Sequence, residues 1–172
     1  FFQSEKYFDS SKFSFQIKNK FITEANNILE TVESKFTKVF VHVRRGDYLS
    51  ETYNNVRGIN LPMSYYEVCF NEIEKTVKNP YYIFLSDDPE FIKFAFIHKE
   101  NKYISENSMG TDLAIMSLCN YGIAANSSFS WWGAYLMNNR EKVFFPKYWY
   151  GWKSKIESHP EITPKWAISI NL

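Results

Sequence analysis

The stretch Val39-Phe-Val-His-Val-Arg-Arg-Gly-Asp47 decides the fold class of this chain. Its first five residues are mostly β-branched or aromatic, and the run is short enough for one buried strand. Arg44 and Arg45 then mark the point at which the chain leaves the core, because adjacent guanidinium groups are costly to bury without partners. The stretch therefore predicts a buried strand that ends in a charged loop.

Similar apolar runs recur along the chain and alternate with segments of helical period. They predict strands at 81–85, 123–125 and 143–145, and helices at 27–32, 64–77, after Asp88-Pro-Glu90, from Thr111 or Asp112 to Cys119, and at 129–138. Strands joined by helices need crossover connections. The predicted fold class is therefore α/β, a Rossmann-like, mostly parallel sheet with helices on both faces.

Three polar groups have the positions of helix caps. Ser64 and Glu67 have the spacing of a capping box. Asp88 precedes a proline that suits the first helical position. The third group, Asn126-Ser-Ser128, precedes the helix predicted at 129–138.

The length of 172 residues suits a single domain with a sizeable core. We expect 1–36 to form a helical lead-in, 37–150 the Rossmann-like core, and 151–172 a carboxyl-terminal arm with only a last helix or an extended segment. No apolar run approaches membrane-spanning length. Because the chain begins at Phe1 without Met, we expect its first residue to be a cut within a longer protein.

Composition narrows the classes of partner. A net charge of +1 supplies no broad basic face, so nucleic acid and anionic membrane surfaces are disfavoured. Aromatic residues make up 19% of the chain, and their rings can build a core or stack on sugars and bases. Cys69 and Cys119 lie in apolar periodic stretches without zinc-ligand spacing, which predicts a reducing compartment and no structural metal.

Three polar loops directly follow predicted strands: Arg44-Arg-Gly-Asp47, Ser86-Asp-Asp88 and Asn126-Ser-Ser128. In an open parallel sheet, ligands bind outside the carboxyl ends of the strands, where the following helices also begin. Planar guanidinium groups suit phosphate oxygens. The sequence therefore predicts a diphosphate site at this edge, with Arg44 facing the ligand and Arg45 turned by the strand pleat towards a pairing acid.

Other roles for these residues remain open. The two arginines could pair structurally with Asp87 and Asp88. The same two aspartates could hold a divalent metal ion, or Asp88 could simply cap a helix. The tripeptide Arg45-Gly-Asp47 also occurs in integrin ligands, but it follows a buried strand here and not an exposed hairpin tip.

The sequence also resembles a known family. Five segments carry this resemblance: Val41-His-Val-Arg-Arg-Gly-Asp-Tyr48, Phe84-Leu-Ser-Asp-Asp88, Asp112-Leu-Ala-Ile-Met-Ser-Leu-Cys119, Ala125-Asn-Ser-Ser-Phe-Ser-Trp-Trp-Gly-Ala134 and, less fully, Phe2-Gln-Ser-Glu-Lys-Tyr-Phe8. They are similar to motifs of the bacterial α-1,2-fucosyltransferases, glycosyltransferase family 11. The family's glycine-rich amino-terminal segment is absent from this sequence. The resemblance therefore implies the carboxyl-terminal, donor-binding half of an enzyme whose acceptor domain is missing.

The resemblance implies a GT-B-type enzyme that transfers L-fucose from GDP-fucose, with inversion, to the 2-hydroxyl of a galactose-containing glycan. It implies no metal and no cofactor besides the donor, and a bacterial cytoplasmic location, with or without peripheral membrane contact through the acceptor. A non-catalytic GDP-sugar or glycan-binding module is the alternative, and an adhesion protein is a third hypothesis.

The same resemblance implies a role for each motif residue. Arg44 would grip the β-phosphate, His42 and Asp112 would address guanosine, Asp87 and Asp88 would shape the nucleotide and fucose site, and Asn126, Ser127, Ser128 and Phe129 would line the diphosphate cradle, with Arg45 beside them. Glu51, in the loop beyond Asp47, is a candidate for the base that deprotonates the acceptor. A solvated loop glutamate is an equal alternative.

Overall fold

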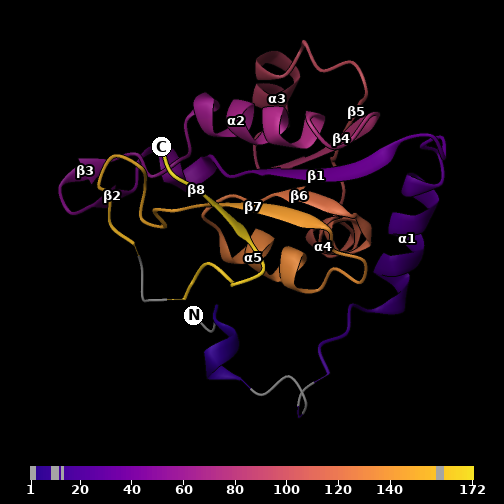
Figure 1. Cartoon of the computed structure of the whole chain (residues 1–172), viewed down its shortest axis with the longest axis horizontal. Coiled ribbons are helices and arrows are strands. Elements are labelled where there is room, and N and C mark those ends of the chain that lie inside the picture. The colour runs from indigo at the N-terminus through magenta and orange to yellow at the C-terminus, as the bar shows by residue number, and fades with distance from the viewer. Residues whose placement is uncertain (1–2, 9–11, 13, 158–160) are drawn as a thin grey trace.

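A computed structural model describes residues 3–8, 12, 14–157 and 161–172. Its main sheet contains β1 (Thr37–Val43), β4 (Pro80–Ser86), β5 (Lys102–Ile104), β6 (Tyr121–Ile123), β7 (Lys142–Pro146) and β8 (Ile168–Ile170). These strands pair in parallel in the order β5-β4-β1-β6-β7-β8 (Figure 1). The chain builds outward from β1 through β4 to β5 and then returns to the other side of β1. The sheet therefore has a topological switch point between β1 and β6, where such folds bind ligands.

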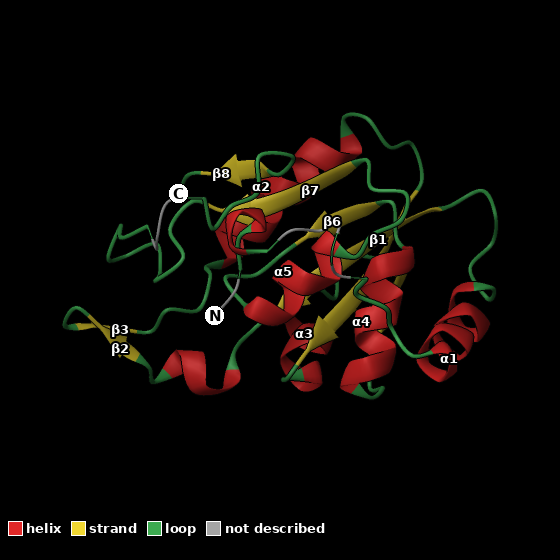
Figure 2. Ribbon diagram, turned by 90° about the horizontal axis from the view of Figure 1, so that it is seen from below, coloured by secondary structure: helices red, strands yellow, loops and turns green. Residues whose placement is uncertain are grey.

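Helices cover both faces of this sheet (Figure 1). One face carries α2 (Met63–Glu74) and α3 (Pro89–Ala95), and the other carries α1 (Asn19–Leu29), α4 (Met109–Leu118) and α5 (Ser128–Tyr135). Figure 2, viewed from below relative to Figure 1, shows α1, α4 and α5 lying in one layer across the strands. This two-sided arrangement confirms the predicted Rossmann-like α/β class.

Alternation along β1 explains why both layers pack on it. Val39, Val41 and Val43 belong to the core beneath α2 and α3, whereas Phe40 belongs to the opposite core. Phe40 pairs in register with Gly122 of β6, and a Cβ atom on Gly122 would overlap the Phe40 ring. The glycine therefore makes room for a large ring in the centre of the sheet.

Several predicted helix boundaries were wrong, and for α2 and α4 the reason is that local polar residues offer more candidate caps than a helix uses. Helix α1 spans Asn19–Leu29 and not 27–32. Helix α2 begins after Pro62 without a side-chain cap, so Ser64 lies inside its first turn and forms no capping box. Helix α4 is capped by Ser108, whose Oγ accepts from the Thr111 backbone N–H at 3.2 Å, and Thr111 and Asp112 therefore lie within the helix.

Other predictions were closer. Asp88 caps α3 with Pro89 in its first turn, and Ser127 caps α5, as expected. Helix α5 ends at Tyr135 before the predicted 138, and Arg140 donates to the carbonyl oxygens of Ala134 and Tyr135 at that end. Strand β6 lies two residues earlier than predicted, because it pairs with the middle of β1. Strands β5 and β8 and the hairpin of β2 (Thr52–Tyr53) and β3 (Val56–Arg57) were not predicted.

Two further findings concern the described residues. Cys69 and Cys119 are both buried with free thiols, in the cores on opposite faces of the sheet. Within the described ranges, no helix has the length and apolar character that crossing a membrane requires.

Candidate functional site

The loops after β1 and β4 meet around Arg44. Its Nη2 lies 2.6 Å from Asp47 Oδ1, within the short helix η2 (Gly46–Leu49), and its Nη1 lies 3.1 Å from Asp87 Oδ2. The backbone N–H of Arg45 also donates to Asp87 Oδ1 at 2.9 Å. The structure therefore brings together the charged ends of two adjacent strands, as the edge-of-sheet rule predicts.

Arg45 faces α3. Its Nε lies 3.0 Å from Asp88 Oδ2, and its guanidinium lies 3.4 Å from the centre of the Phe91 ring. Asp88 also accepts from the Phe91 backbone N–H at 3.0 Å, and that bond, together with Arg45, lowers the pKa of the Asp88 carboxyl. The pairing acid predicted for Arg45 is therefore Asp88.

Gly46 allows the loops after β1 and β4 to approach closely enough for Asp87 to contact Arg44 and the Arg45 backbone. A Cβ atom at this position would overlap the Asp87 carboxylate. Any side chain there would push Asp87 away from Arg44 and from the Arg45 backbone. The glycine of the Arg-Arg-Gly-Asp run is thus required by close approach and not by a left-handed backbone.

Both arginines are paired with carboxylates in this structure, which is the structural alternative left open by the sequence. Two guanidinium groups face three carboxylates, so a diphosphate would have to compete for Arg44. Asp47 is the easier partner to displace, because its side chain is 59% exposed whereas that of Asp87 is 25% exposed. Among the described residues, no group of three or more His, Cys, Asp or Glu is arranged to hold a metal ion.

Asn126 links three loops at the carboxyl end of β6. Its Nδ2 donates to the carbonyl oxygens of Ile59 and Trp149, each at 2.9 Å, and its backbone carbonyl oxygen accepts from the Tyr48 hydroxyl at 3.0 Å. Ser127 accepts from the Phe129 backbone N–H at 3.3 Å and so caps α5. The side-chain amide of Asn126 therefore fixes the loops that contain Ile59 and Trp149 next to the end of β6.

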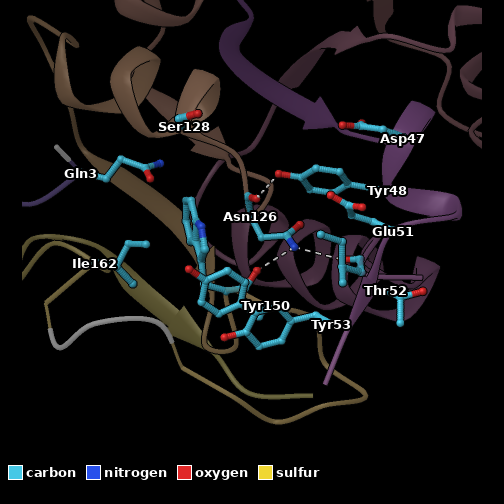
Figure 3. Close-up of a pocket in the computed structure, with 12 residues that line it drawn as sticks. Gln3, Asp47, Tyr48, Glu51, Thr52, Tyr53, Asn126, Ser128, Tyr150 and Ile162 are labelled. Atoms are coloured by element: carbon cyan, nitrogen blue, oxygen red, sulfur yellow. Dashed lines mark hydrogen bonds between the residues drawn. The ribbon is translucent and has the colours of Figure 1, made fainter. Parts of the chain in front are cut away.

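A cavity of about 390 Å³ opens at the switch point, beside this cluster. Figure 3 shows side chains from the loops after β1, β6 and β7 around it, including Asp47, Tyr48, Glu51, Asn126 and Ser128. The β2–β3 hairpin closes one side, and Tyr53 stacks on Tyr150 with ring centres 4.1 Å apart. The cavity thus joins predicted residues to aromatic ones that the sequence did not single out.

Glu51 and Tyr48 both line this cavity. Glu51 is exposed at its edge, where a carboxylate could take a proton, and its role as a base remains a prediction. Tyr48 was missed: Arg44 lies 5.4 Å from its ring centre, and burial raises the pKa of its hydroxyl. Its place directly after the Arg-Arg-Gly-Asp run was the available signal.

His42 is buried within β1, with its ring centre 5.5 Å from that of Phe129. Burial, with a smaller effect of the Arg44 charge, lowers the pKa of His42 to about 3. The imidazole is therefore neutral at physiological pH. Its Nδ1 is buried without a hydrogen-bond partner.

Asp112 lies apart from the arginines, in a polar cluster beyond the end of β5. Its Oδ1 accepts from Ser105 Oγ at 2.5 Å, and Asn107 Nδ2 donates to the same Ser105 Oγ at 2.8 Å. Burial raises the pKa of Asp112 to about 6, although the Ser105 and Asn107 hydrogen bonds act in the opposite direction. This cluster lies beyond β5, whereas the cavity is lined by the loops after β1, β6 and β7, so β4 separates the two along the same edge of the sheet.

The parallel sheet, its switch point and the polar edge form a Rossmann-like α/β fold, as in one half of a GT-B-type glycosyltransferase. The solved structure of NodZ α-1,6-fucosyltransferase soaked with GDP-fucose has the same fold, with a TM-score of 0.51 at 11% identity over 74% of this chain and 44% of that one. Residues 1–168 match the family Glycosyl transferase family 11, and the chain belongs to that family.

Two relatives from Escherichia coli support the assignment. The chain is 35% identical to the O-antigen biosynthesis glycosyltransferase WbnK over 67% of this chain and 40% of the relative. It is 33% identical to an alpha-1,2-colitosyltransferase over 80% of this chain and 50% of the relative. The chain thus spans half or less of the length of these two relatives.

Proposed function

We propose that the protein transfers L-fucose from GDP-fucose to the 2-hydroxyl of a β-galactoside, with inversion at the sugar carbon. The observation that carries this proposal is the position of Arg44, which lies beside the switch-point cavity and contacts two of its lining residues, Asp47 and Tyr48. Family membership and the motifs quoted above support the same activity.

In this proposal the donor lies along the carboxyl edge of the sheet. Asp112 accepts from the N–H groups of guanine, and Arg44 contacts the diphosphate after displacing Asp47. The first turn of α5 offers N–H groups to the same anion. The fucose ring then points towards the cavity, on the far side of β1 from Asp112.

The chemistry follows from charge. The acceptor oxygen attacks the anomeric carbon as the bond from that carbon to the β-phosphate oxygen breaks, and the proton of the acceptor hydroxyl passes to Glu51. Negative charge grows on the leaving GDP, and the Arg44 guanidinium stabilises it more in the transition state than in the ground state. No metal ion takes part in this scheme.

Calorimetry and product analysis test the proposal. We expect GDP and GDP-fucose to bind at least tenfold more tightly than UDP-sugars, because a uracil cannot satisfy Asp112 in the same way. We also expect the protein expressed from its complete gene to convert GDP-fucose and lactose to an α-1,2-linked product that NMR identifies. Equal affinity for GDP and UDP would contradict the donor assignment.

A second donor is favoured by one comparison. Because the chain is 33% identical to an alpha-1,2-colitosyltransferase, GDP-colitose is the alternative donor. A non-catalytic sugar-binding module is the alternative outside enzymes. Parallel assays with GDP-fucose and GDP-colitose separate the two donors, and binding without turnover by the protein from the complete gene would favour the module.

A further inference from the structure

Two buried polar atoms on the wall of the switch-point cavity have no hydrogen-bond partner. They are Gln3 Nε2, on a residue only 4% exposed, and Asn126 Oδ1, on a residue only 1% exposed. Both residues line the cavity, and Figure 3 shows the Gln3 amide directed into it. Buried polar groups are rarely left unpaired, because each costs free energy of desolvation. The two atoms therefore indicate a ligand with complementary hydrogen-bonding groups.

The orientation of the Asn126 amide is fixed by its neighbours. Its Nδ2 faces the carbonyl oxygens of Ile59 and Trp149, which can only accept. Oδ1 must therefore be the atom left without a partner. The cavity wall offers an acceptor at this point.

Gln3 is held in place by the segment that follows it. In the short helix η1 (Glu5–Tyr7), Glu5 Oε1 accepts from Trp166 Nε1 at 3.0 Å. The cavity-lining residue Ile162 is in turn held by the Trp131 indole, which donates to its carbonyl oxygen at 2.7 Å. Residues from near both ends of the described chain thus complete the cavity, and Gln3 Nε2 is an unpartnered donor among them.

The remaining lining selects the class of ligand. Asp47 and Glu51 carry negative charge at the cavity, so an anionic group is disfavoured inside it. Tyr53, stacked on Tyr150, supplies an aromatic wall that can pack against C–H groups. A neutral ring with several hydroxyls fits all of these features, because a hydroxyl both accepts from an amide N–H and donates to an amide oxygen. The volume also falls within the range of about 300–1,000 Å³ typical of small-molecule sites.

We infer that this cavity binds a neutral hexopyranose ring, with Gln3 donating to one of its hydroxyls and Asn126 accepting from one. This inference rests on the proposed function for the source of the ring, which is the sugar of the donor or the galactose of the acceptor. Gln3 is then a binding residue of the transfer reaction, supplied by the amino-terminal segment.

Substitution of Gln3 tests the inference in the protein expressed from its complete gene. Gln3→Leu keeps the volume and removes the donor, and we expect it to raise one KM, for GDP-fucose or for lactose, roughly tenfold. The other KM, the affinity for GDP alone, and Tm are expected to stay near wild-type values. The KM that rises identifies the ring. Gln16→Leu, at an exposed position of the same amino-terminal part, is the matched control.

Other outcomes overturn the inference. Unchanged KM values for both substrates would mean that water alone fills the cavity, and a fall in Tm with weaker GDP binding would give Gln3 a structural role. If the wild-type protein transfers no fucose, the proposed function fails separately. Saturation-transfer NMR with L-fucose and methyl β-galactoside then still tests the cavity. A sugar signal that is present with wild type and lost in Gln3→Leu supports the sugar site. The absence of any sugar signal with wild type overturns the inference.

Discussion

Arg44 and Asp87 form an ion pair between the ends of neighbouring strands, with Nη1 3.1 Å from Oδ2. Asp87 also accepts from the Arg45 backbone N–H at 2.9 Å, so one carboxylate fixes both the side chain and the main chain of the β1 loop. Because Asp87 holds Nη1 independently of Asp47, the guanidinium stays oriented when a ligand displaces the more exposed Asp47 from Nη2. Such preorganisation is what stabilisation of a leaving group requires.

Arg44→Lys is expected to lower kcat by roughly 10² to 10³, which corresponds to about 3–4 kcal/mol of transition-state stabilisation. A lysine keeps the charge, but it cannot bridge Asp47 and Asp87 in one plane or contact a phosphate with two parallel N–H groups. Steady-state kinetics on the protein from the complete gene provides the measurement. A fully active Arg44→Lys variant would remove the leaving-group assignment.

Arg45→Lys is expected to affect stability more than chemistry. It loses the contact with the Phe91 face and the Nε bond to Asp88, so Tm should fall by roughly 2–4 °C. Thermal unfolding monitored by circular dichroism measures this change, and kcat measured alongside should fall far less than in Arg44→Lys. A larger loss of kcat in Arg45→Lys than in Arg44→Lys would exchange the two roles.

GDP affinity is expected to decrease as the pH falls through about 6. The pKa of Asp112 is raised to about 6 by burial, so the carboxylate that we propose accepts from guanine predominates above that pH and is protonated below it. Affinity should therefore fall about tenfold per pH unit on the acidic side. Calorimetry between pH 5 and pH 8 tests this slope. Asp112→Asn is the control, since it removes the slope due to this group and leaves the one due to the phosphates of GDP.

EDTA is expected to leave GDP-fucose binding and turnover unchanged. Asp87 and Asp88 are each already paired with an arginine, and in the proposed site Arg44 and the first turn of α5 would supply the positive potential for the diphosphate. Calorimetry and turnover before and after chelation measure the effect. Loss of activity that Mn²⁺ restores would instead make Asp87 and Asp88 metal ligands.

Tyr65→Phe is expected to lower the free energy of unfolding by about 1–2 kcal/mol. The buried Tyr65 hydroxyl lies 2.7 Å from the Ala124 carbonyl oxygen and 3.1 Å from that of Phe144, so it joins the residue after β6 to the middle of β7. Tyr66→Phe is the matched control, because its hydroxyl makes only a 3.4 Å bond to the His42 carbonyl oxygen. Urea unfolding compares the two, and an equal loss in both variants would contradict this ranking.

The sequence by itself determined the layered fold and the edge that carries the site. Short β-branched and aromatic runs such as 39–43 are stable only when both faces are covered, and the helical segments between them fix parallel crossovers. Parallel strands place their following loops at one edge, so Arg44, Asp87 and Asn126 could be assigned to a common region from sequence order alone. These inferences depend on periodicity and connectivity, which are local properties.

Only the tertiary structure decided which groups pair and what closes the cavity. Asp47, Asp87 and Asp88 are chemically equivalent partners for two arginines, and the assignment depends on backbone approach at Gly46 and on the position of Phe91. Ser64 was predicted to cap α2 but lies inside its first turn, whereas Ser108, which was not predicted, caps α4 in place of Thr111 or Asp112. Gln3 and Tyr53 reach the cavity through contacts between segments far apart in the chain, and no local pattern encodes such contacts, because their energy exists only after the sheet has brought those segments together.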